Sequence, residues 1–354
     1  MDLNIAVLSG DGIGPEVTNE AVKVMDVISK KFDHKINISE GLTGAIAIDK
    51  KGNPYPDETH QICEKSDAVL FGAIGDPKYD NDPSAKVRPE QGLLEMRKKL
   101  GLYANLRPTI VFESLINNSP LKKDRIQNTD LIFVRELTGG IYFGKRGRKD
   151  NGNFAYDTCE YNRYEVERIA QLGFEMALKR KRKLCCVDKA NVLESSRLWR
   201  ETVQNMESRF PDVKVSYEFV DAVAMRLIQW PSKYDVLVTS NLFGDILTDE
   251  ASVISGSMGL MPSASIGAKN ALYEPIHGSY PQAAGKNIAN PVGSILSLAM
   301  MFEHSFNLEK ESNIIKQAVE NSLKEKITTQ DISGNDKTYS TSDVGDFICN
   351  YINS

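Results

Sequence analysis

Apolar residues occur along the chain in short uninterrupted runs that alternate with longer stretches of helical periodicity. The runs, rich in Val, Ile, Leu and Phe, occupy residues 5–8, 68–71, 131–134, 184–187 and 236–239. The amphipathic stretches occupy residues 16–31, 163–179, 195–210 and 293–304. Buried strands that alternate with helices are typical of an α/β fold with a largely parallel sheet. The pattern therefore predicts that fold class.

Length and composition add a second lobe to this picture. The 354 residues exceed what one hydrophobic core usually serves, so we expect two lobes. A composition of 41% hydrophobic and 26% charged residues is that of an ordinary globular protein. The longest apolar stretch, residues 292–302, contains Gly293 and two serines and is too short to span a bilayer. We therefore expect a core helix there and no membrane partner.

The cysteines and the start of the chain bear on the compartment. The five cysteines form no CxxC pair, their number is odd, and Cys185 and Cys186 lie in a predicted buried strand. They are interpreted as reduced thiols that pack like small apolar residues. The first predicted strand leaves no room for a signal peptide. Together these features predict a cytoplasmic protein.

Charge argues against a nucleic acid as partner, with two local exceptions. The formal net charge is −5, but basic runs occupy residues 145–149 and 179–183. The second run closes a predicted helix, where cations interact favourably with the helix C-terminus. Neither run is interleaved with aromatic residues that could stack on bases, so we favour a structural role. Nucleic-acid binding is the alternative, and tight binding at physiological ionic strength would support it.

A glycine-rich turn follows the first predicted strand, in the sequence Gly10-Asp-Gly-Ile-Gly-Pro15. Pro15 suits the first position of a helix. A dinucleotide fingerprint would place its third glycine one residue later, and an acidic residue after a second strand would bind the ribose. The spacing therefore favours a tight strand-to-helix turn over a Rossmann site.

The segment from Ser240 to Glu250 carries the most informative chemical pattern. It follows a predicted strand and starts a helix, on which Asp245 and Asp249 share one face at i and i+4. Like charges at that spacing destabilise a helix by roughly 0.2–0.5 kcal/mol, and no Lys or Arg lies nearby in sequence to offset them. Mg²⁺ would offset them, with Asp221 as a candidate third ligand. The alternative is a solvated acidic turn stabilised by the helix dipole.

Further candidate residues stand near the ends of predicted strands or beside Gly and Pro. Lys189 follows one strand, at the edge where open α/β sheets place ligands, and a lysine in a dry site acts as a general base. Arg135 follows another strand and, with Arg97 and Arg107, offers the bidentate geometry that suits carboxylates. Tyr142, beside a glycine pair, is a candidate hydroxyl acid. For each residue taken alone, a solvated or packed side chain is the alternative.

Taken together, these segments resemble one family over essentially the whole chain, the β-decarboxylating dehydrogenases of 2-hydroxy acids, or isocitrate/isopropylmalate dehydrogenase family. The motifs that carry the resemblance are, in order, Gly10-Asp-Gly-Ile-Gly-Pro-Glu16, Arg88-Pro-Glu-Gln-Gly-Leu-Leu94 with Arg97, Leu106-Arg-Pro108, Arg135-Glu-Leu-Thr-Gly-Gly-Ile-Tyr-Phe-Gly144, Asp188-Lys-Ala-Asn-Val192, Asn241-Leu-Phe-Gly-Asp-Ile-Leu-Thr-Asp249, Glu274-Pro-Ile-His-Gly-Ser279 and Gly285-Lys-Asn-Ile-Ala-Asn-Pro291. So many long motifs in one order argue against a coincidental match.

The resemblance implies a two-lobed α/β fold with a largely parallel central sheet that is not Rossmann, in agreement with the glycine spacing. Residues 1–103 and 256–354 would form a first lobe with both termini and most of the NAD site. Residues 104–255 would form a second lobe that carries the dimer interface. The family works as a homodimer whose active sites are shared between subunits, so Lys189 and Asp221 would reach into the partner's cleft.

The resemblance also implies a chemistry. The two carboxylates of the substrate would be bound by three arginines, Arg97, Arg107 and Arg135. Mg²⁺ or Mn²⁺ would be held by Asp245, Asp249 and, from the other subunit, Asp221. Lys189, through water, would take the hydroxyl proton as hydride leaves for NAD. The β-keto acid would then lose CO₂, the metal would stabilise the enolate, and Tyr142 would donate the last proton. A noncatalytic homologue would lack one of these residues, and all are present.

Substrate choice would depend on the segment from Glu90 to Leu94, and the resemblance adds Val192 to the substrate site. Isocitrate enzymes of the family place a small hydroxyl residue in this segment, whereas Leu93 and Leu94 offer an apolar wall that suits isopropyl. Such a contact discriminates by about 1–3 kcal/mol, or about 10–200-fold. We therefore expect isopropylmalate as the substrate. The alternatives are a sibling reaction on tartrate, isocitrate or another malate derivative, and Leu93 and Leu94 as plain helix core.

The cofactor loop departs from the family pattern at one position. Where many NAD-using members carry Asp, this chain has Gln282, which can hydrogen-bond a ribose but lacks the charge that repels a 2′-phosphate. No Arg lies between Ile327 and Lys337, where NADP-using relatives place phosphate contacts, so NAD remains the prediction. His277 and Asn290 would flank the adenine. The residues assigned to the cofactor are Ile13, Glu274, His277, Gly278, Ser279, Gln282, Ala289 and Asn290.

Overall fold

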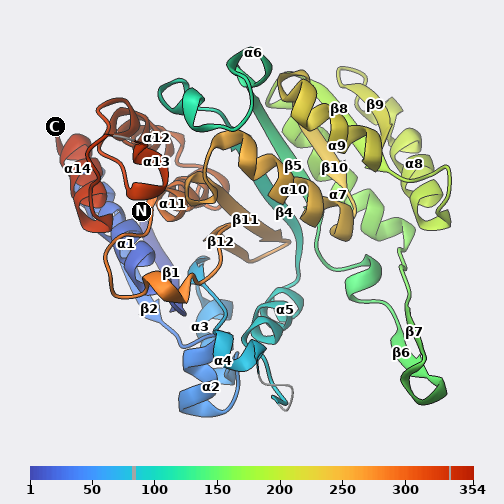
Figure 1. Ribbon diagram of the computed structural model, residues 1–354, viewed down its shortest axis with the longest axis horizontal. Coiled ribbons are helices and arrows are strands. Elements are labelled where there is room, and N and C mark those ends of the chain that lie inside the picture. Colours follow the sequence, from blue (N-terminus) through green and yellow to red (C-terminus); the bar gives the residue numbers. More distant parts are fainter. Residues whose placement is uncertain (82–84, 335) are drawn as a thin grey trace. The chain divides into compact units, whose positions relative to one another are not determined.

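The fold is described from a computed structural model, in which residues 1–81, 85–334 and 336–354 are described. The chain divides into two compact units, one made of Met1–Leu102 with Gly256–Ser354 and the other of Tyr103–Ser255. The first unit therefore contains both chain ends, and each unit combines strands with covering helices (Figure 1). Among the described residues no helix is both long and apolar enough to cross a membrane.

The strands of the first unit lie in the order β2, β1, β3, β12, β11. Strands β2, β1, β3 and β12 run parallel, and β11 pairs antiparallel with β12. Every residue of β3 is buried, as expected for a strand that is covered on both faces. The bounds are β1 Asp2–Gly10, β2 Lys35–Glu40, β3 Ala68–Ala73, β11 Pro262–Gly267 and β12 Ala271–Pro275.

The longest apolar stretch forms α11, which is a core helix as predicted. Eleven of its residues are buried, and it packs against β11, β12, α1 and α12. Helix α1 also packs against α14, so an early and a late helix of the chain lie side by side in this unit (Figure 1). The helices of the unit are α1 Gly14–Lys31, α2 Ala45–Lys51, α3 Asp57–Lys65, α4 Pro77–Asp80, α5 Pro89–Lys99, α11 Val292–His304, α12 Glu309–Lys324, α13 Gln330–Ser333 and α14 Thr341–Asn353, with the 3-10 turns η6 Met258–Leu260 and η7 Pro281–Ala283.

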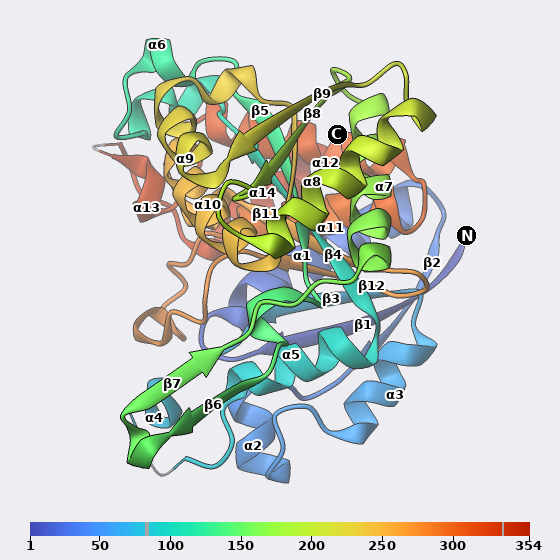
Figure 2. The ribbon, with the colours of Figure 1, turned by 90° about the vertical axis from the view of Figure 1, so that its right-hand side faces the viewer.

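The strands of the second unit lie in the order β4, β5, β10, β8, β9. All pairs are parallel except β4 with β5, in which Arg107 lies opposite Phe133. A separate hairpin, β6 with β7, extends away from the rest of this unit (Figure 2). The bounds are β4 Leu102–Ile110, β5 Asp130–Glu136, β6 Arg146–Lys149, β7 Phe154–Asp157, β8 Lys183–Asp188, β9 Lys214–Phe219 and β10 Val236–Thr239. The prediction of an α/β fold with a largely parallel sheet is confirmed.

Side chains alternate between the two faces of each strand, and this alternation determines which helix each side chain contacts in the second unit. Leu131 and Phe133 of β5 belong to one core cluster with residues of α9 and α10. Arg135 is the next residue on that side of the strand, so its side chain points towards α10. The opposite face is covered by α7, where Gly173 lies close to Val238. The helices are α6 Lys123–Ile126, α7 Arg163–Leu178, α8 Glu194–Met206, α9 Val220–Gln229 and α10 Asn241–Ser255, with the 3-10 turns η1 Glu113–Asn118, η2 Gly140–Tyr142, η3 Asp150–Gly152, η4 Glu207–Arg209 and η5 Pro231–Lys233.

Candidate functional site

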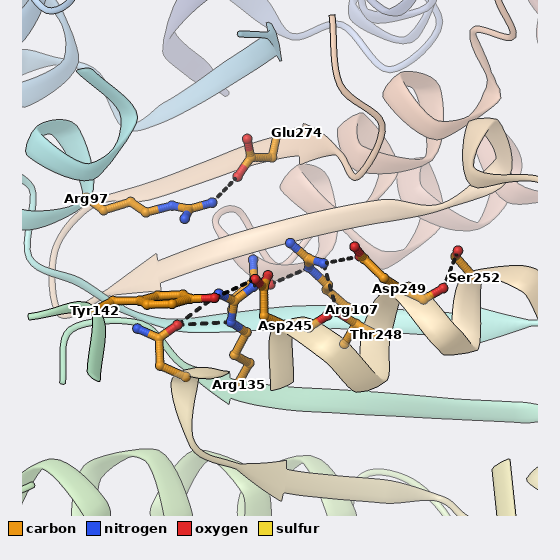
Figure 3. A network of polar contacts seen from close by, with 11 residues as sticks. Arg97, Arg107, Arg135, Tyr142, Asp245, Thr248, Asp249, Ser252 and Glu274 are labelled. Atoms are coloured by element: carbon orange, nitrogen blue, oxygen red, sulfur yellow. Dashed lines mark hydrogen bonds and ion pairs between the residues drawn. The ribbon is translucent and has the colours of Figure 1, made fainter. Parts of the chain in front are cut away.

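Helix α10 packs against β5 and η2 in the second unit, and these contacts bring three predicted site residues together (Figure 3). Arg135 Nη1 donates to Asp245 Oδ1 at 2.5 Å, and the Tyr142 hydroxyl donates to Asp245 Oδ2 at 2.8 Å. The Arg135 side chain is 4% exposed, whereas that of Asp245 is 39% exposed. One carboxylate is therefore held by donors on both oxygens and still presents a surface to a ligand.

Two residues of α10 position Arg135. Asn241 Oδ1 accepts from Arg135 Nε at 3.2 Å and from Nη2 at 2.8 Å. A Cβ on Gly244 would lie 2.6 Å from Arg135 Cγ, so only glycine lets the helix approach the strand this closely. The aspartates make this segment recognisable in the sequence, but the roles of Asn241 and Gly244 are not apparent there. A glycine inside a helix costs about 1 kcal/mol relative to alanine, and this cost is the signal that could have revealed Gly244.

The surroundings of Asp245 fix its protonation state and that of Tyr142. Burial acts to raise the pKa of Asp245, but the charge of Arg135, the hydrogen bond from Tyr142 and the charge of Arg107 together lower that pKa below its ordinary value. Burial and the hydrogen bond to Asp245 raise the pKa of Tyr142 to about 12. At neutral pH the pair is therefore a carboxylate and a protonated phenol.

Arg107 of β4 contacts the next turn of α10. Its Nη1 donates to Thr248 Oγ1 at 2.8 Å and lies 3.4 Å from Asp249 Oδ1, while its Nε donates to Asn105 Oδ1 at 2.8 Å. The Asp249 side chain is 63% exposed. Arg135 and Arg107 thus offset the like charges of Asp245 and Asp249. The sequence pattern does not reveal this, because these arginines are distant in sequence from α10.

Lys189 and Asp221 form a separate pair in the second unit. Lys189 follows the last residue of β8, Asp221 lies in the first turn of α9, and the two side chains form an ion pair. The hydrogen bond from Lys189 lowers the pKa of Asp221. Lys189 Nζ also lies 5.8 Å from the centre of the Phe219 ring. Within a single chain, the described residues contain no group of three His, Cys, Asp or Glu side chains that could hold a metal, so Asp221 does not join Asp245 and Asp249 there.

The last residue of β8 and the turn after it contribute two further residues. Asp188 accepts from Arg200 Nε at 2.8 Å and from Arg200 Nη2 at 2.9 Å, so its carboxylate holds α8 against the strand. Val192 is 61% exposed in this turn. Of the predicted residues around Lys189, Val192 is thus open to a ligand, whereas Asp188 has a structural role.

In the first unit, Arg97 of α5 and Glu274 of β12 form an ion pair of 3.1 Å (Figure 3). Their side chains are 11% and 10% exposed. Arg97 Nε is buried and has no hydrogen-bond partner among the described residues. The predicted apolar wall starts from the same helix, in whose first turn Glu90 lies.

Leu93 and Leu94 differ in their surroundings. Leu93 packs against the core cluster of the first unit that includes Met96 and Leu100. Leu94 is 40% exposed. Within the chain, Leu94 is therefore the more accessible of the two leucines. Leu93 is in part a core residue of the helix, which was the alternative interpretation.

The glycine-rich turn after β1 joins the predicted cofactor loop. Gly10 and Gly12 have φ angles of +70° and +57°, which confirms the tight turn predicted from their spacing. The Ile13 N–H donates to the carbonyl of Ser279 at 2.8 Å, and a Cβ on Gly12 would lie 2.0 Å from that carbonyl oxygen. Ile13 packs with Ala289 in a small apolar cluster. Ile13, Ser279 and Ala289 are therefore brought together.

The other predicted cofactor residues lie along the same loop. His277 contacts the Gly278 carbonyl through Nδ1 at 2.9 Å, while its Nε2 is buried without a hydrogen-bond partner among the described residues. Burial lowers the pKa of His277, so the imidazole is neutral at neutral pH. Asn290 donates to Asp331 Oδ2 at 3.1 Å. Gln282 and Gly278 are exposed. An unpartnered ring nitrogen is a group that a bound molecule can satisfy.

Two further carboxylates fix these loops by accepting hydrogen bonds from backbone N–H groups. Asp11 accepts hydrogen bonds from the N–H groups of Ala45 at 2.8 Å, Ile46 at 3.0 Å and Gly75 at 2.9 Å. Glu16 accepts from the N–H groups of Gly285 and Asn287. Both stand inside the glycine-rich motif, but their partners are far away in sequence, so no local pattern identifies them.

The basic run 179–183 serves the fold of the second unit. Arg180 donates to Asp130 Oδ1 at 2.7 Å and to Asp235 Oδ1 at 2.8 Å. The Asp235 side chain has no exposed surface. The run 145–149 lies largely in the hairpin strand β6. For the first of these runs, the contacts favour the structural interpretation.

Comparisons with known proteins agree with the resemblance carried by the motifs. The family model described as isocitrate/isopropylmalate dehydrogenase matches residues 4–348. The chain is 55% identical to a 3-isopropylmalate dehydrogenase of Bacteroides fragilis, with 99% of each chain covered. It is 52% identical to a 3-isopropylmalate dehydrogenase of Aquifex aeolicus, with 93% of this chain and 91% of that protein covered.

Solved structures show the same likeness at lower identity. An isocitrate dehydrogenase from Methylococcus capsulatus superposes with a TM-score of 0.88 at 31% identity, with 99% of this chain and 100% of that chain covered. A β-decarboxylating dehydrogenase from Thermococcus kodakarensis superposes with a TM-score of 0.80 at 34% identity, with 99% of this chain and 96% of that chain covered.

Proposed function

Because the chain belongs to the isocitrate/isopropylmalate dehydrogenase family, we propose that it catalyses the oxidative decarboxylation of 3-isopropylmalate. The products would be 4-methyl-2-oxopentanoate and CO₂, with reduction of NAD, in a step of leucine biosynthesis. The observation that carries this proposal is the identity of 55% over 99% of both chains with a relative of that name. The contacts among Arg135, Tyr142 and Asp245 support it, since they gather a cation, a proton donor and a carboxylate.

The substrate carboxylates would be bound by Arg97, Arg107 and Arg135. Arg97 Nε is buried and unpartnered in the described structure, and a carboxylate would satisfy it. Arg107 contacts Asp249 at the long distance of 3.4 Å, so a closer anion can take over part of its charge. Arg135 is held by Asn241 through its Nε and Nη2, which fixes the plane of its guanidinium.

A divalent cation, Mg²⁺ or Mn²⁺, would be held by Asp245, Asp249 and Asp221 of the partner subunit. The donor set fits, because carboxylate oxygens are the ligands these ions prefer, and the three side chains are 39%, 63% and 63% exposed. When bound, the ion would act as a Lewis acid on the 2-hydroxy acid and on the enolate left by CO₂ loss.

Tyr142 and Lys189 would move the protons. Tyr142 is protonated at neutral pH because its pKa is about 12, so it can donate to the carbon that has lost CO₂. Lys189 would accept the substrate's hydroxyl proton, through water, in the site of the partner, after its ammonium group has given up a proton, because the ammonium of the ion pair has no free electron pair. Its ion pair with Asp221 means that both residues would enter that site together.

NAD would bind along the loop that follows β12. The unpartnered Nε2 of His277 fits a hydrogen bond from or to an adenine ring. Gln282 is exposed and can bind a ribose hydroxyl, but it adds no negative charge against a 2′-phosphate. We therefore expect NAD as the preferred cofactor, with weaker discrimination against NADP than in relatives that carry Asp at this position.

A homodimer would complete the site through α9 and α10. Met225 and Ile228 of α9 are 60% and 47% exposed, and Ile246 and Val253 of α10 are 59% and 51% exposed. Helical spacing places Asp221 on the same face as Met225 and Ile228, and Asp249 between Ile246 and Val253. Exposed apolar faces of this kind are buried in symmetric dimers. Burying them would carry Asp221 and Asp249 to the interface as well.

The direct test is an assay of NADH formation with purified protein. We expect 3-isopropylmalate to give the highest kcat/KM, the rate to vanish with EDTA and to return with Mg²⁺ or Mn²⁺, and NADP⁺ to be used less well than NAD⁺. Isocitrate and tartrate are the competing substrates. Leu93 is partly packed into the core and leaves Leu94 as the more accessible apolar residue, so a preference for 3-isopropylmalate over these two would depend mainly on Leu94.

Three outcomes would overturn parts of the proposal. A higher kcat/KM for isocitrate or tartrate would replace the substrate and remove the argument from Leu94. A rate that is unaffected by EDTA would remove the metal site at Asp245 and Asp249. Equal use of NAD⁺ and NADP⁺ would show that Gln282 does not select the cofactor.

A further inference from the structure

A pocket of about 430 Å³ lies at the edge of the second unit where β8, β9 and β10 begin. This volume is within the range of about 300–1,000 Å³ that is usual for small-molecule sites. The candidate catalytic residue Lys189 follows the opposite end of β8. Because β8 spans Lys183–Asp188, about 17 Å of strand separates Lys183 from Asp188, and none of the lining residues is a candidate functional residue. The pocket is therefore distinct from the candidate functional site.

Strand register places two lysines next to each other in the wall of this pocket. Strands β8 and β9 are parallel, with Lys183 opposite Lys214 and Cys185 opposite Ser216. These residues share one face of the strands, the face on which Cys185 packs in one core cluster with residues of α9 and α10. The C-terminal part of α9 and the following turn, with Trp230, complete the wall.

The positive charges of the pocket are not neutralised. Like charges directly opposite each other on neighbouring strands destabilise a sheet. In the described parts of the chain, no ion pair involves the ammonium groups of Lys183, Lys214 or Lys233. A carboxylate within reach would be expected to compensate such a group of cations.

The two acidic residues of the pocket already have other partners, which for Glu218 are lining residues as well. Glu218 pairs with Arg226 at 2.6 Å and accepts a hydrogen bond from Tyr234 at 2.8 Å. Asp235 has no exposed side-chain surface and is held by Arg180 at 2.8 Å. The lining therefore carries an excess of positive charge from its three lysines.

The remaining lining is neutral and partly apolar. Trp230 is 40% exposed, and Lys233 Nζ lies 4.6 Å from the centre of its ring. Burial raises the pKa of the Cys185 thiol to about 12, so this side chain carries no charge at neutral pH. Ser216 is exposed and offers a hydroxyl. A cationic rim beside an aromatic ring and a hydroxyl suits a small organic anion.

We propose that this pocket binds a multiply charged small anion, either a polycarboxylate or a phosphate compound, through Lys183, Lys214 and Lys233. Three ammonium groups without carboxylate partners match an anion of charge two or more better than a monoanion. The anion would relieve the repulsion between Lys183 and Lys214 across the β8–β9 pair, so its binding should stabilise the fold.

Trp230 provides a direct readout of binding. The chain contains two tryptophans, and the other, Trp199, is 2% exposed, so changes in the pocket would act mainly on the emission of Trp230. The full chain would be titrated with tricarballylate, with inorganic pyrophosphate and with adenosine monophosphate, at 50 and 500 mM NaCl. We expect a saturable change in emission with at least one anion, weaker at the higher salt concentration. The three anions separate a carboxylate from a phosphate source. A linear response or none with all three would overturn the proposal.

Matched variants test whether the pocket lysines are responsible. Lys183→Gln combined with Lys214→Gln should raise the Kd by about tenfold or more, because both contacts are charge-assisted. Lys214→Arg keeps the charge and should bind within about threefold of the original chain. Lys179→Gln, an exposed position outside the pocket, removes one charge and should leave the Kd unchanged.

Calorimetric titration of these variants would confirm the site independently of fluorescence, and thermal unfolding without anion would show that each one folds. Equal weakening in the Lys179→Gln variant would mean that only overall charge matters and would overturn the proposal. Competition by 3-isopropylmalate would also overturn it, because the anion would then occupy the substrate site. Saturating Kd values that change only in the pocket variants would support it.

Discussion

At the residue scale, the pKa of Asp245 depends on side chains from three separate segments of the second unit. Arg135 comes from β5, Tyr142 from η2 and Arg107 from β4, and together they lower the pKa of Asp245 against the effect of its burial. Burial and the hydrogen bond to Asp245 raise the pKa of Tyr142, so the pair shares one proton, which stays on the phenol. A substitution at either residue should therefore change the pKa of the other.

Replacing Tyr142 by phenylalanine tests its role as a proton donor. We expect kcat for 3-isopropylmalate to fall by about 10²–10⁴-fold, since the chain would lose its acid. The loss should be the same at every pH from about 6 to 9, because the pKa of Tyr142, about 12, lies above this range. An alkaline limb in the pH profile that disappears in the variant would contradict this assignment. Unchanged affinity for NAD serves as the control.

Gly244→Ala tests the close approach of α10 to Arg135. Alanine favours a helix over glycine by about 1 kcal/mol, so propensity alone would stabilise the variant. The new Cβ would lie 2.6 Å from Arg135 Cγ, and we expect a net loss of about 1–3 kcal/mol in urea denaturation. Gly173→Ala in α7 is the control, because the nearest atom there is a Leu184 methyl carbon at 3.3 Å. Equal effects of both changes would refute the steric argument.

At the element scale, ion pairs and hydrogen bonds of charged side chains link helices and strands whose relative positions the hydrophobic pattern alone does not determine. Arg180 joins the loop before β8 to Asp130 of β5 and to Asp235, which precedes β10. Glu303 of α11 pairs with Lys316 of α12 and accepts a hydrogen bond from Ser312 at 3.2 Å. The Asp235 side chain has no exposed surface, whereas those of Glu303 and Lys316 are 35% and 43% exposed, so solvent screens the second pair more than the first.

Arg180→Ala should cost about 2–3 kcal/mol of unfolding free energy, because it leaves the carboxylate of Asp235 buried without its charged partner. Lys179→Ala, the exposed neighbour, should change stability by less than about 0.5 kcal/mol. Urea denaturation of both variants is the measurement. If the two variants were equally stable, the basic run would have no structural role, and nucleic-acid binding would become the better explanation of its charge.

Glu303→Gln tests the pH dependence of the link between α11 and α12. Burial acts to raise the pKa of Glu303, but the hydrogen bond and charge of Lys316 lower it below the ordinary value of 4.5. Since the folded pKa is depressed, this carboxylate contributes stability above about pH 4.5, and the contribution is lost as the pH falls through the folded value. We expect the stability difference between the original chain and the variant to be constant from about pH 6 to 7 and to shrink below pH 4.5. A difference that grows on acidification would contradict this sign.

At the scale of the whole molecule, the proposed active site needs two chains. Lys189 and Asp221 form an ion pair with each other and do not join the acidic pair of α10 in the same chain. The exposed apolar residues of α9 and α10 share their faces with Asp221 and Asp249. A dimer through these helices would bury the apolar faces and bring the carboxylates together.

Mixing two inactive variants tests this sharing. Lys189→Ala and Tyr142→Phe would each be inactive alone, but a mixed dimer would contain one site with an intact Tyr142 from one chain and an intact Lys189 from the other. Random mixing after unfolding and refolding should restore about a quarter of the original activity, since half of the dimers are mixed and half of their sites are complete. A mixture that stays inactive although it forms dimers would place Lys189 and Tyr142 in the same chain's site. Mixing Lys189→Ala with Asp221→Asn is the control and should restore nothing, because both residues come from the same side.

Much of the site was accessible from the sequence because its members lie in motifs at the ends of predicted elements. Arg135, Lys189 and Asp245 were each selected from a strand end or from spacing on a helix, since hydrophobic periodicity is a local property. Asn241 and Asp11 were missed, because their roles depend on partners from distant segments. The antiparallel strands β4 and β11 were missed as well, since their runs contain polar residues and proline.

The sequence by itself determined the α/β class, the tight turn at Gly10 and Gly12, and the family, because periodicity, glycine spacing and ordered motifs are written along the chain. Only the tertiary structure decided that Arg135 and Arg107 offset Asp245 and Asp249, and that Lys189 pairs with Asp221. It also placed Lys183 beside Lys214, away from the catalytic candidates. These outcomes depend on register and packing between segments far apart in the chain, and no local pattern encodes the distance between two such side chains.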